Sequence, residues 1–203
     1  MAGRRAGQRF DAELQVTTEA LVFLGELDPE AIGPAIEFAT HYEPTPVSDA
    51  EALLDASPLA PETTTFVDVG AGMGRVVLLA ARRPFHAVVG VELSPALAEI
   101  ARDNLASADD PRRVARSVRI VRADAARWTL PRGDLVVYLY NPFRAPVLSA
   151  LLTRLGRDSE RRVVLLYHTP VERSTIDADD RFRLVADLGF GLVYVSRTPT
   201  SSR

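Results

Sequence analysis

The stretch that most constrains the fold is an apolar run that stops at three glycines and resumes as a helical pattern. Residues 64–69 are β-branched or apolar with one acid, as in a strand covered on both faces. Gly70, Gly72 and Gly74 follow at alternate positions, and a run of Ala, Leu and Val begins after Arg75. Glycines permit φ > 0 and let a ligand approach the backbone. The pattern predicts a strand, a ligand-binding turn and a helix whose first N–H groups face the ligand.

Acidic residues stand at or near the ends of three predicted strands. Asp68 lies two residues before the first glycine, Glu92 ends the strand at 86–92, and Asp124 follows the strand at 118–121. Because parallel strands of a doubly wound sheet end at the same edge, we expect these acids to lie together. Glu92 comes about twenty residues after the glycines, where nucleotide-binding units place the acid that holds a ribose. The alternative is a structural joint with incidental acids.

The position of Asp68 bears on which nucleoside cofactor would bind. A pyrophosphate would be repelled by this acid, and the third glycine comes one residue earlier than in G-x-G-x-x-G. S-adenosylmethionine has no phosphate, and its ammonium, ribose hydroxyls and adenine amine all suit acidic partners. We therefore expect Asp68 to serve the amino acid part, Glu92 the ribose and Asp124 the adenine. The alternative for Asp124 is an N-cap of the following turn, and the two roles are compatible.

Backbone groups are expected to complete this cofactor site. They belong to residues of the glycine turn and to the residue after each of the two later acids: Gly70, Ala71, Gly72, Gly74, Leu93 and Ala125.

Candidate acceptor residues follow the fourth and fifth predicted strands, at 134–140 and 162–167. An Asn141 side chain can accept a hydrogen bond from an amine or hydroxyl, and the Tyr140 ring can wall a channel and exclude water. His168 is a candidate general base. The alternatives are a strand terminated by Pro142 with packing aromatics, and a hydrogen-bonded structural histidine.

Five strands with helical crossovers are followed by a predicted hairpin, 182–188 and 192–196 around Gly189-Phe190-Gly191. The expected fold is therefore α/β, a doubly wound, mostly parallel seven-stranded sheet. Its expected order is 3-2-1-4-5-7-6, with strand 7 antiparallel and short helices at the N-terminus. Residues 174–180 are too few for a full crossover helix, so one or two turns or a loop are expected there.

Three regions are expected along the chain: a disordered arm at 1–9, a helical extension and cap at 10–60, and the main domain at 61–203. Two prolines in 41–46 favour an extended crossing over a helix, with a plain linker as the alternative. Ser48 followed by Glu51 predicts a capping box for a helix at 48–54.

Composition limits the remaining possibilities. The 203 residues include no cysteine, which excludes disulfides, thiolate metal sites and a cysteine nucleophile, and no metal site is expected. The net charge of −3 gives no nucleic-acid signal. No apolar run reaches membrane-spanning length, and the basic start lacks the apolar stretch of a signal peptide. A cytoplasmic protein without a membrane partner is expected, and its oligomeric state stays open.

The stretch at 68–74 resembles motif I of the class I S-adenosylmethionine-dependent methyltransferases, D-x-G-x-G-x-G. The layout at 41–45, 68–75, 84–95 and 139–143 is similar to a group of small bacterial members. The segment with Tyr42 and Thr45 also resembles seven-strand protein-lysine methyltransferases, in which it folds over the methionine part of the cofactor. This implies that Tyr42 and Thr45 contact cofactor or acceptor. Asn141-Pro142-Phe143 departs from the Asn-Pro-Pro-Tyr of enzymes that methylate amino groups of nucleic acids, so the acceptor stays open.

The resemblance implies transfer of the sulfonium methyl to an N, O or C acceptor, a small molecule or a protein side chain. Because the cofactor is already activated, alignment is expected to supply most of the rate enhancement. One alternative is a protein of this fold that binds a nucleoside without catalysis. Another is an NAD-dependent oxidoreductase, which the glycine spacing and Asp68 disfavour.

Overall fold

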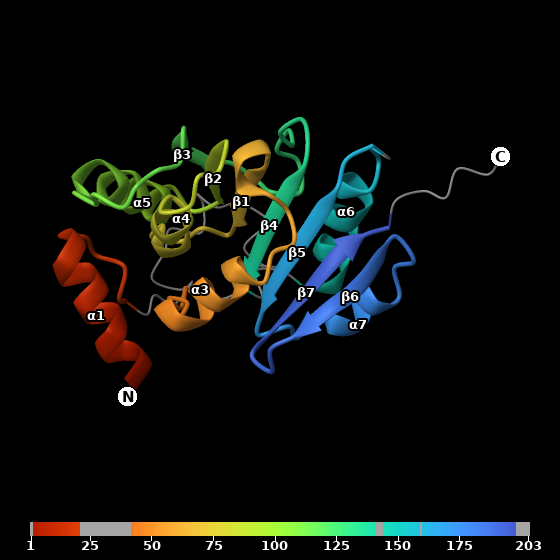
Figure 1. The fold of residues 1–203 in the computed structure, drawn as a ribbon, viewed down its shortest axis with the longest axis horizontal. Coiled ribbons are helices and arrows are strands. Elements are labelled where there is room, and N and C mark those ends of the chain that lie inside the picture. Colours follow the sequence, from red (N-terminus) through yellow and green to blue (C-terminus); the bar gives the residue numbers. More distant parts are fainter. Residues whose placement is uncertain (1, 21–41, 141–143, 159, 198–203) are drawn as a thin grey trace.

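The computed structural model describes residues 2–20, 42–140, 144–158 and 160–197, and a seven-stranded sheet forms its centre (Figure 1). Its strands are β1 (Thr65–Val69), β2 (Ala87–Glu92), β3 (Val118–Arg122), β4 (Leu135–Tyr140), β5 (Val163–His168), β6 (Phe182–Asp187) and β7 (Gly191–Ser196). The order is β3-β2-β1-β4-β5-β7-β6, with β7 antiparallel to both β5 and β6 and the other pairs parallel. The predicted fold class and strand order are confirmed.

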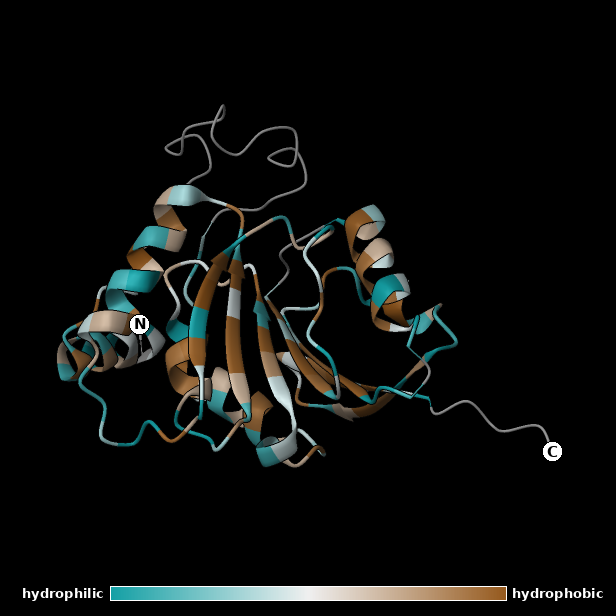
Figure 2. Ribbon diagram, turned by 90° about the horizontal axis from the view of Figure 1, so that it is seen from above, coloured by the Kyte–Doolittle hydropathy of each residue, from teal (hydrophilic) through white to brown (hydrophobic). Residues whose placement is uncertain are grey.

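Helices cover both faces of the sheet, as Figure 2 shows from above. They are α1 (Ala2–Leu14), α3 (Val47–Asp55), the 3₁₀ turn η3 (Pro61–Thr63), α4 (Arg75–Ala80), α5 (Pro95–Ser107), α6 (Ala145–Leu155) and α7 (Arg173–Asp177). One apolar cluster joins α1, α3, α4 and α5 to the first face, and a second joins α6 and α7 to the other. Every residue of β1 is buried, as expected of a central strand covered on both sides. No helix in these described ranges is long and apolar enough to cross a membrane.

Strand pairing brings polar side chains onto the first face in one row. Successive strand residues point to opposite faces. Phe66 belongs to the first cluster and Val67 to the second, so Asp68 returns to the first face. Asp68 pairs with Tyr138 of β4, which also lies in the first cluster. Two residues on, Tyr140 pairs with His168 of β5. The row therefore runs across three strands on the face that α3 covers.

Local sequence signals define some helix ends and fail at another. Ser94 caps α5 as its Oγ accepts the Leu97 N–H at 3.3 Å, and Pro95 follows at the first helical position. The predicted capping box at Ser48 is wrong, because α3 begins one residue earlier and its N-cap is Pro46. The Pro46 carbonyl accepts the N–H groups of Asp49 and Ala50, and the Ser48 hydroxyl donates to the Asp49 side chain.

The N-terminal residues are helical where a disordered arm was expected. α1 spans Ala2–Leu14, so the prediction is wrong for residues 2–9. Phe10 and Leu14 are buried in the first cluster, and this apolar face gives the helix its tertiary support. The further helices expected within 10–38 fall mainly in 21–41, outside the described residues.

The C-terminal hairpin forms as predicted, with β6 at the edge of the sheet and α7 as the short helix before it. Gly189 in the turn has φ +82°. The pairing register shifts between Leu184 and Ala186, and the side chains of Leu184 and Val185 are exposed.

Candidate active site

The three glycines form the predicted turn between β1 and α4. Gly70, Gly72 and Gly74 have φ of 78°, 53° and 87°, a region that favours glycine. The N–H groups of Gly70 and Ala71 donate to the Val91 carbonyl of β2 at 2.9 and 3.1 Å. The turn is thereby held against the end of the neighbouring strand, where Gly70 is exposed and Gly72 and Gly74 are buried.

Asp68 is a buried acid without a hydrogen-bond donor in the described parts of the chain. Only 3% of the residue is exposed, because it lies on a central strand of the sheet. Burial, and to a smaller extent the charge of the nearby Glu92, raises the pKa of its carboxyl to about 8. A buried carboxyl usually has a donor or a cation beside it. None of the described residues therefore supplies the positive partner that would let Asp68 ionise.

Glu92 ends β2 and joins the glycine turn to the start of α5. Its Oε2 accepts the Gly72 N–H at 2.7 Å, and its Oε1 accepts the Ser94 N–H at 2.8 Å. Burial raises the pKa of this carboxyl, against the effect of the N–H donors. Each carboxylate oxygen has a second lone pair, so Glu92 retains capacity for ribose hydroxyls.

Asp124 caps the turn that follows β3. Its Oδ1 accepts the Ala126 N–H at 2.8 Å, and its carbonyl accepts the N–H groups of Arg127 and Trp128. The capping role is confirmed, and the predicted adenine contact stays a prediction. Arg154 of α6 also holds this turn, because its guanidinium donates to the carbonyls of Ala125, at 2.6 Å, and of Trp128. Nothing in the local sequence marks Arg154 for this contact.

Tyr42 and Thr45 lie over the sheet edge beside the turn. A Cβ added to Gly72 would overlap the Tyr42 ring, so the ring rests directly on that glycine. The Tyr42 hydroxyl donates to the Thr18 carbonyl at 2.7 Å. Thr45 is buried, and its Oγ1 accepts the Tyr138 hydroxyl at 3.1 Å. Residues 43–46 form neither a helix nor a strand, as the two prolines predicted, and we call residues 42–46 the crossing.

Arg75, which the sequence analysis did not assign a role, fastens this crossing to the turn. The side chain is 3% exposed and begins α4 directly after the last glycine. Its Nε donates to Thr18 Oγ1 at 2.7 Å, one terminal nitrogen to Glu19 Oε2 at 2.7 Å, and the other to the Thr45 carbonyl at 3.2 Å. One guanidinium therefore connects the segment after α1, the crossing and the glycine turn.

Replacing Gly72 with Ala is expected to lower the free energy of unfolding by about 3 kcal/mol. A residue other than glycine at φ +53° costs about 1–2 kcal/mol, and the new methyl must displace Tyr42. The matched control is Gly133→Ala, where φ is +78° but no atom lies within 4 Å, so only the backbone cost remains. Urea unfolding of both variants measures the difference. Equal losses would contradict the packing of Tyr42 on Gly72.

The structure brings Tyr140 and His168 together at the ends of β4 and β5. Their ring centroids are 4.5 Å apart, edge to face. His168 Nε2 lies 3.2 Å from Asp49 Oδ2 of α3, and Nδ1 lies 3.0 Å from Thr169 Oγ1. The predicted Asn141 and its neighbours 142 and 143 lie outside the described residues, so their roles stay predictions.

Burial shifts both ring groups toward their neutral forms. Burial, together with the nearby Glu43, raises the pKa of the Tyr140 hydroxyl to about 12. It lowers the pKa of His168, although Asp49 opposes this shift. Burial therefore favours the neutral imidazole of His168, and each of its ring nitrogens has a side-chain partner, Asp49 or Thr169.

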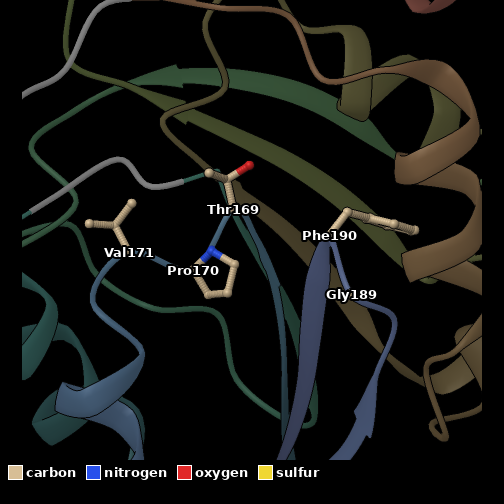
Figure 3. A pocket seen from close by; sticks show the side chains of 5 residues that line it. All are labelled: Thr169, Pro170, Val171, Gly189 and Phe190. Carbon is tan, nitrogen blue, oxygen red and sulfur yellow. The ribbon is translucent and has the colours of Figure 1, made fainter.

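An open pocket of about 330 Å³ adjoins this pair (Figure 3). It is lined by Thr169, Pro170, Val171, Gly189 and Phe190, from the end of β5 and the hairpin turn. The Phe190 ring lies 5.9 Å from His168, centroid to centroid. The pocket is mainly apolar and lies next to the histidine.

Comparison with known proteins gives a domain match and structural likenesses. Residues 66–157, a little under half of the chain, match the family model described as a methyltransferase domain. No curated protein matches. An RNA methyltransferase from Salinibacter ruber, solved with S-adenosyl-L-homocysteine, is 24% identical at a TM-score of 0.51, covering 77% of this chain and 94% of that one. A ribosomal protein L11 methylase from Lactobacillus delbrueckii subsp. bulgaricus is 17% identical at 0.52, covering 74% and 77%. At these identities the likeness shows a shared fold.

Proposed function

We propose, from the premise that this chain carries a class I S-adenosylmethionine-dependent methyltransferase domain, that it transfers the sulfonium methyl to an N, O or C acceptor. The acceptor is a small molecule or a protein side chain. The observation that carries the proposal is the Asp68 carboxyl, buried beside the glycine turn with no donor among the described residues. The cationic ammonium of S-adenosylmethionine is the partner that this carboxyl lacks.

Each of the other predicted contacts has a role in this proposal. Glu92 holds the ribose hydroxyls with its remaining lone pairs, while Gly72 and Ser94 fix its orientation. The turn at 124–125 meets the adenine. The backbone of Leu93, the residue after Glu92, completes the cofactor site. Tyr42 and Thr45 cover the amino acid part, held by Thr18, Tyr138 and Arg75.

The bound cofactor supplies an activated methyl group, so the protein's task is to align the acceptor and exclude water. Tyr140, His168 and Asn141 are the proposed acceptor-side residues. The relatives of similar fold are named for methylating RNA and a ribosomal protein. With a net charge of −3, this chain has no basic excess for a nucleic-acid acceptor. We therefore favour a small molecule or a protein side chain as the acceptor.

Isothermal titration with S-adenosylmethionine and S-adenosylhomocysteine tests the cofactor assignment. Glu92→Gln is expected to weaken binding about 10- to 100-fold, because hydrogen bonds to a charged group contribute about 1.5–3 kcal/mol. Glu62→Gln, an exposed acid in η3, is the control and should bind as the wild type does. The assignment is wrong if the wild type gives no heat, or if NAD competes as well as S-adenosylhomocysteine does. Binding without turnover on any acceptor would favour the non-catalytic alternative.

A further inference from the structure

The outer strand β3 lies at the opposite end of the sheet from β6, and within the described chain no strand lies beyond it (Figure 1). Its pairing with β2 is parallel and runs over five residue pairs without a register shift. The other outer strand, β6, has a register shift between Leu184 and Ala186. β3 is therefore the regular edge of this sheet, the kind of edge to which another strand can add.

The pairing with β2 determines which backbone groups of β3 point away from the sheet. The Ser117 carbonyl accepts the Val88 N–H at 2.8 Å. Alternate residues of a strand bond to the same neighbour, so the odd-numbered residues of β3 bond to β2. The N–H and C=O groups of Val118 and Ile120 then face the open edge, and they have no hydrogen bond to any other described residue.

Residues 111–132, which contain β3 and the loops on either side, carry a concentrated positive charge. They include seven arginines and one acid, Asp124, so their net charge is +6 in a chain of net charge −3. Arg113, Arg116 and Arg119 are exposed, and none of these side chains has a hydrogen bond or an ion pair within the described ranges. They recur at every third residue, so unpaired positive charge follows the edge.

This charge determines which strand suits the edge. A second copy that offered its own β3 would bring a further charge of +6, so the arginines oppose pairing between copies. An acidic strand neutralises the arginines and also supplies partners for the outward N–H and C=O groups of Val118 and Ile120. A nucleic acid fits less well, because its phosphates only accept hydrogen bonds and leave the two outward carbonyls without donors.

We propose that β3 is a docking edge for an extended acidic segment of a partner protein, which adds to the seven-stranded sheet as a further strand. Main-chain hydrogen bonds to Val118 and Ile120 hold the segment, and its carboxylates pair with Arg116 and Arg119. β3 is separated from β5 by three strands, so an occupant of this edge leaves the pocket beside His168 open. The docking goes beyond the proposed function and does not depend on it.

Hydrogen exchange of the full chain tests the docking edge directly. The probe is an acetylated and amidated peptide of repeating Glu-Val-Thr, whose glutamates have the three-residue spacing of the arginines. In the free protein the amides of Val118 and Ile120 are expected to exchange faster than those of Arg119 and Val121, which bond to β2. The peptide is expected to slow the exchange of Val118 and Ile120 by about 10-fold or more. Slow exchange of these two amides before the peptide is added, or no change afterwards, would overturn the proposal.

Titration calorimetry with the same peptide tests the role of the charge. Arg116→Gln combined with Arg119→Gln is expected to weaken binding about 3- to 10-fold, since each exposed ion pair contributes little. Arg183→Gln removes an exposed arginine from the other outer strand, β6, and should bind as the wild type does.

Two altered peptides and one polyanion complete the test. A peptide that is N-methylated at every residue keeps its charge but has no N–H donors, so it is expected to lose binding. Equal binding of the methylated peptide, or of a peptide with Lys in place of Glu, would overturn the proposal. Binding of polythymidylate without binding of the acidic peptide would also overturn it, and would identify a nucleic-acid site instead.

Discussion

Asp68→Asn is expected to weaken S-adenosylmethionine binding about 100-fold and yet to stabilise the free protein at neutral and higher pH. The loss follows because a buried carboxylate paired with a cation contributes about 2–5 kcal/mol to binding. The gain follows because the free protein holds this carboxyl buried, without a donor in the described chain. An amide of the same shape avoids the cost of ionising there.

The pKa of Asp68 in the folded and unfolded states determines whether the free energy of unfolding rises or falls with pH. The pKa of Asp68 is about 8 in the folded protein and about 4 when unfolded, so between these values the folded state binds more protons. The free energy of unfolding therefore falls as pH rises from about 4 to about 8. Asp68→Asn should remove this decline and be more stable than the wild type by about 1–3 kcal/mol at pH 8.5.

Cofactor binding should release a proton from the same carboxyl. At pH 7 Asp68 is protonated in the free protein, and an ammonium beside it favours ionisation. Titrations of S-adenosylmethionine in buffers of different ionisation enthalpy measure the release, and urea unfolding at pH 5, 7 and 8.5 measures the stability. Asp103→Asn, an exposed acid on α5, should match the wild type in both. No proton release, or a parallel decline of stability in Asp68→Asn, would refute the assignment.

Arg75→Met is the second change with a large expected effect, a loss of about 3–5 kcal/mol in the free energy of unfolding. Methionine keeps the apolar stem but removes the charge, which leaves Glu19 and the Thr45 carbonyl without their donor. Breaking a buried ion pair by removing one partner costs this much. The 10–19 segment and the crossing are expected to open together, since both depend on the one guanidinium.

Arg83→Met is the matched control for this variant. Arg83 pairs with Asp55 at 2.5 Å, but Asp55 is 72% exposed, so solvent screens the pair and about 1 kcal/mol or less is expected. Urea unfolding gives the stabilities, and hydrogen exchange at residues 10–19 and 42–46 shows whether those amides lose protection. The role given to Arg75 would not stand if both variants cost the same and protection were unchanged.

Local patterns in the sequence were sufficient for the sheet and for the glycine turn. A buried strand, three glycines and a helix are neighbours in the chain, so composition and spacing carry the information. The position of Asp68, Glu92 and Asp124 near the ends of their strands could be predicted from topology, because parallel strands end at one edge of the sheet. The raised pKa of Asp68 could not be predicted from topology, because it depends on burial of the carboxyl without a hydrogen-bond donor among the described residues.

The contacts that hold the site together are long-range and leave no local pattern. Arg75 lies 57 residues from Thr18 and 56 from Glu19, and His168 lies 119 residues from Asp49. Arg75 follows a glycine turn and Asp49 lies at the start of a helix, and both positions are common for these residue types. The local sequence therefore gives no sign of their distant partners. The helix at 2–14 was missed for the same reason, because its stability comes from the packing of Phe10 and Leu14 on the domain.

The irregular outer strand has a consequence for self-association. β6 presents its free side to solvent, with Leu184 and Val185 exposed, which is the kind of edge that invites strand addition by a second molecule. The register shift between Leu184 and Ala186 bends the strand and interrupts its ladder at that point. A neighbouring chain would find no straight run of backbone donors and acceptors to extend, so the bulge protects this edge against aggregation.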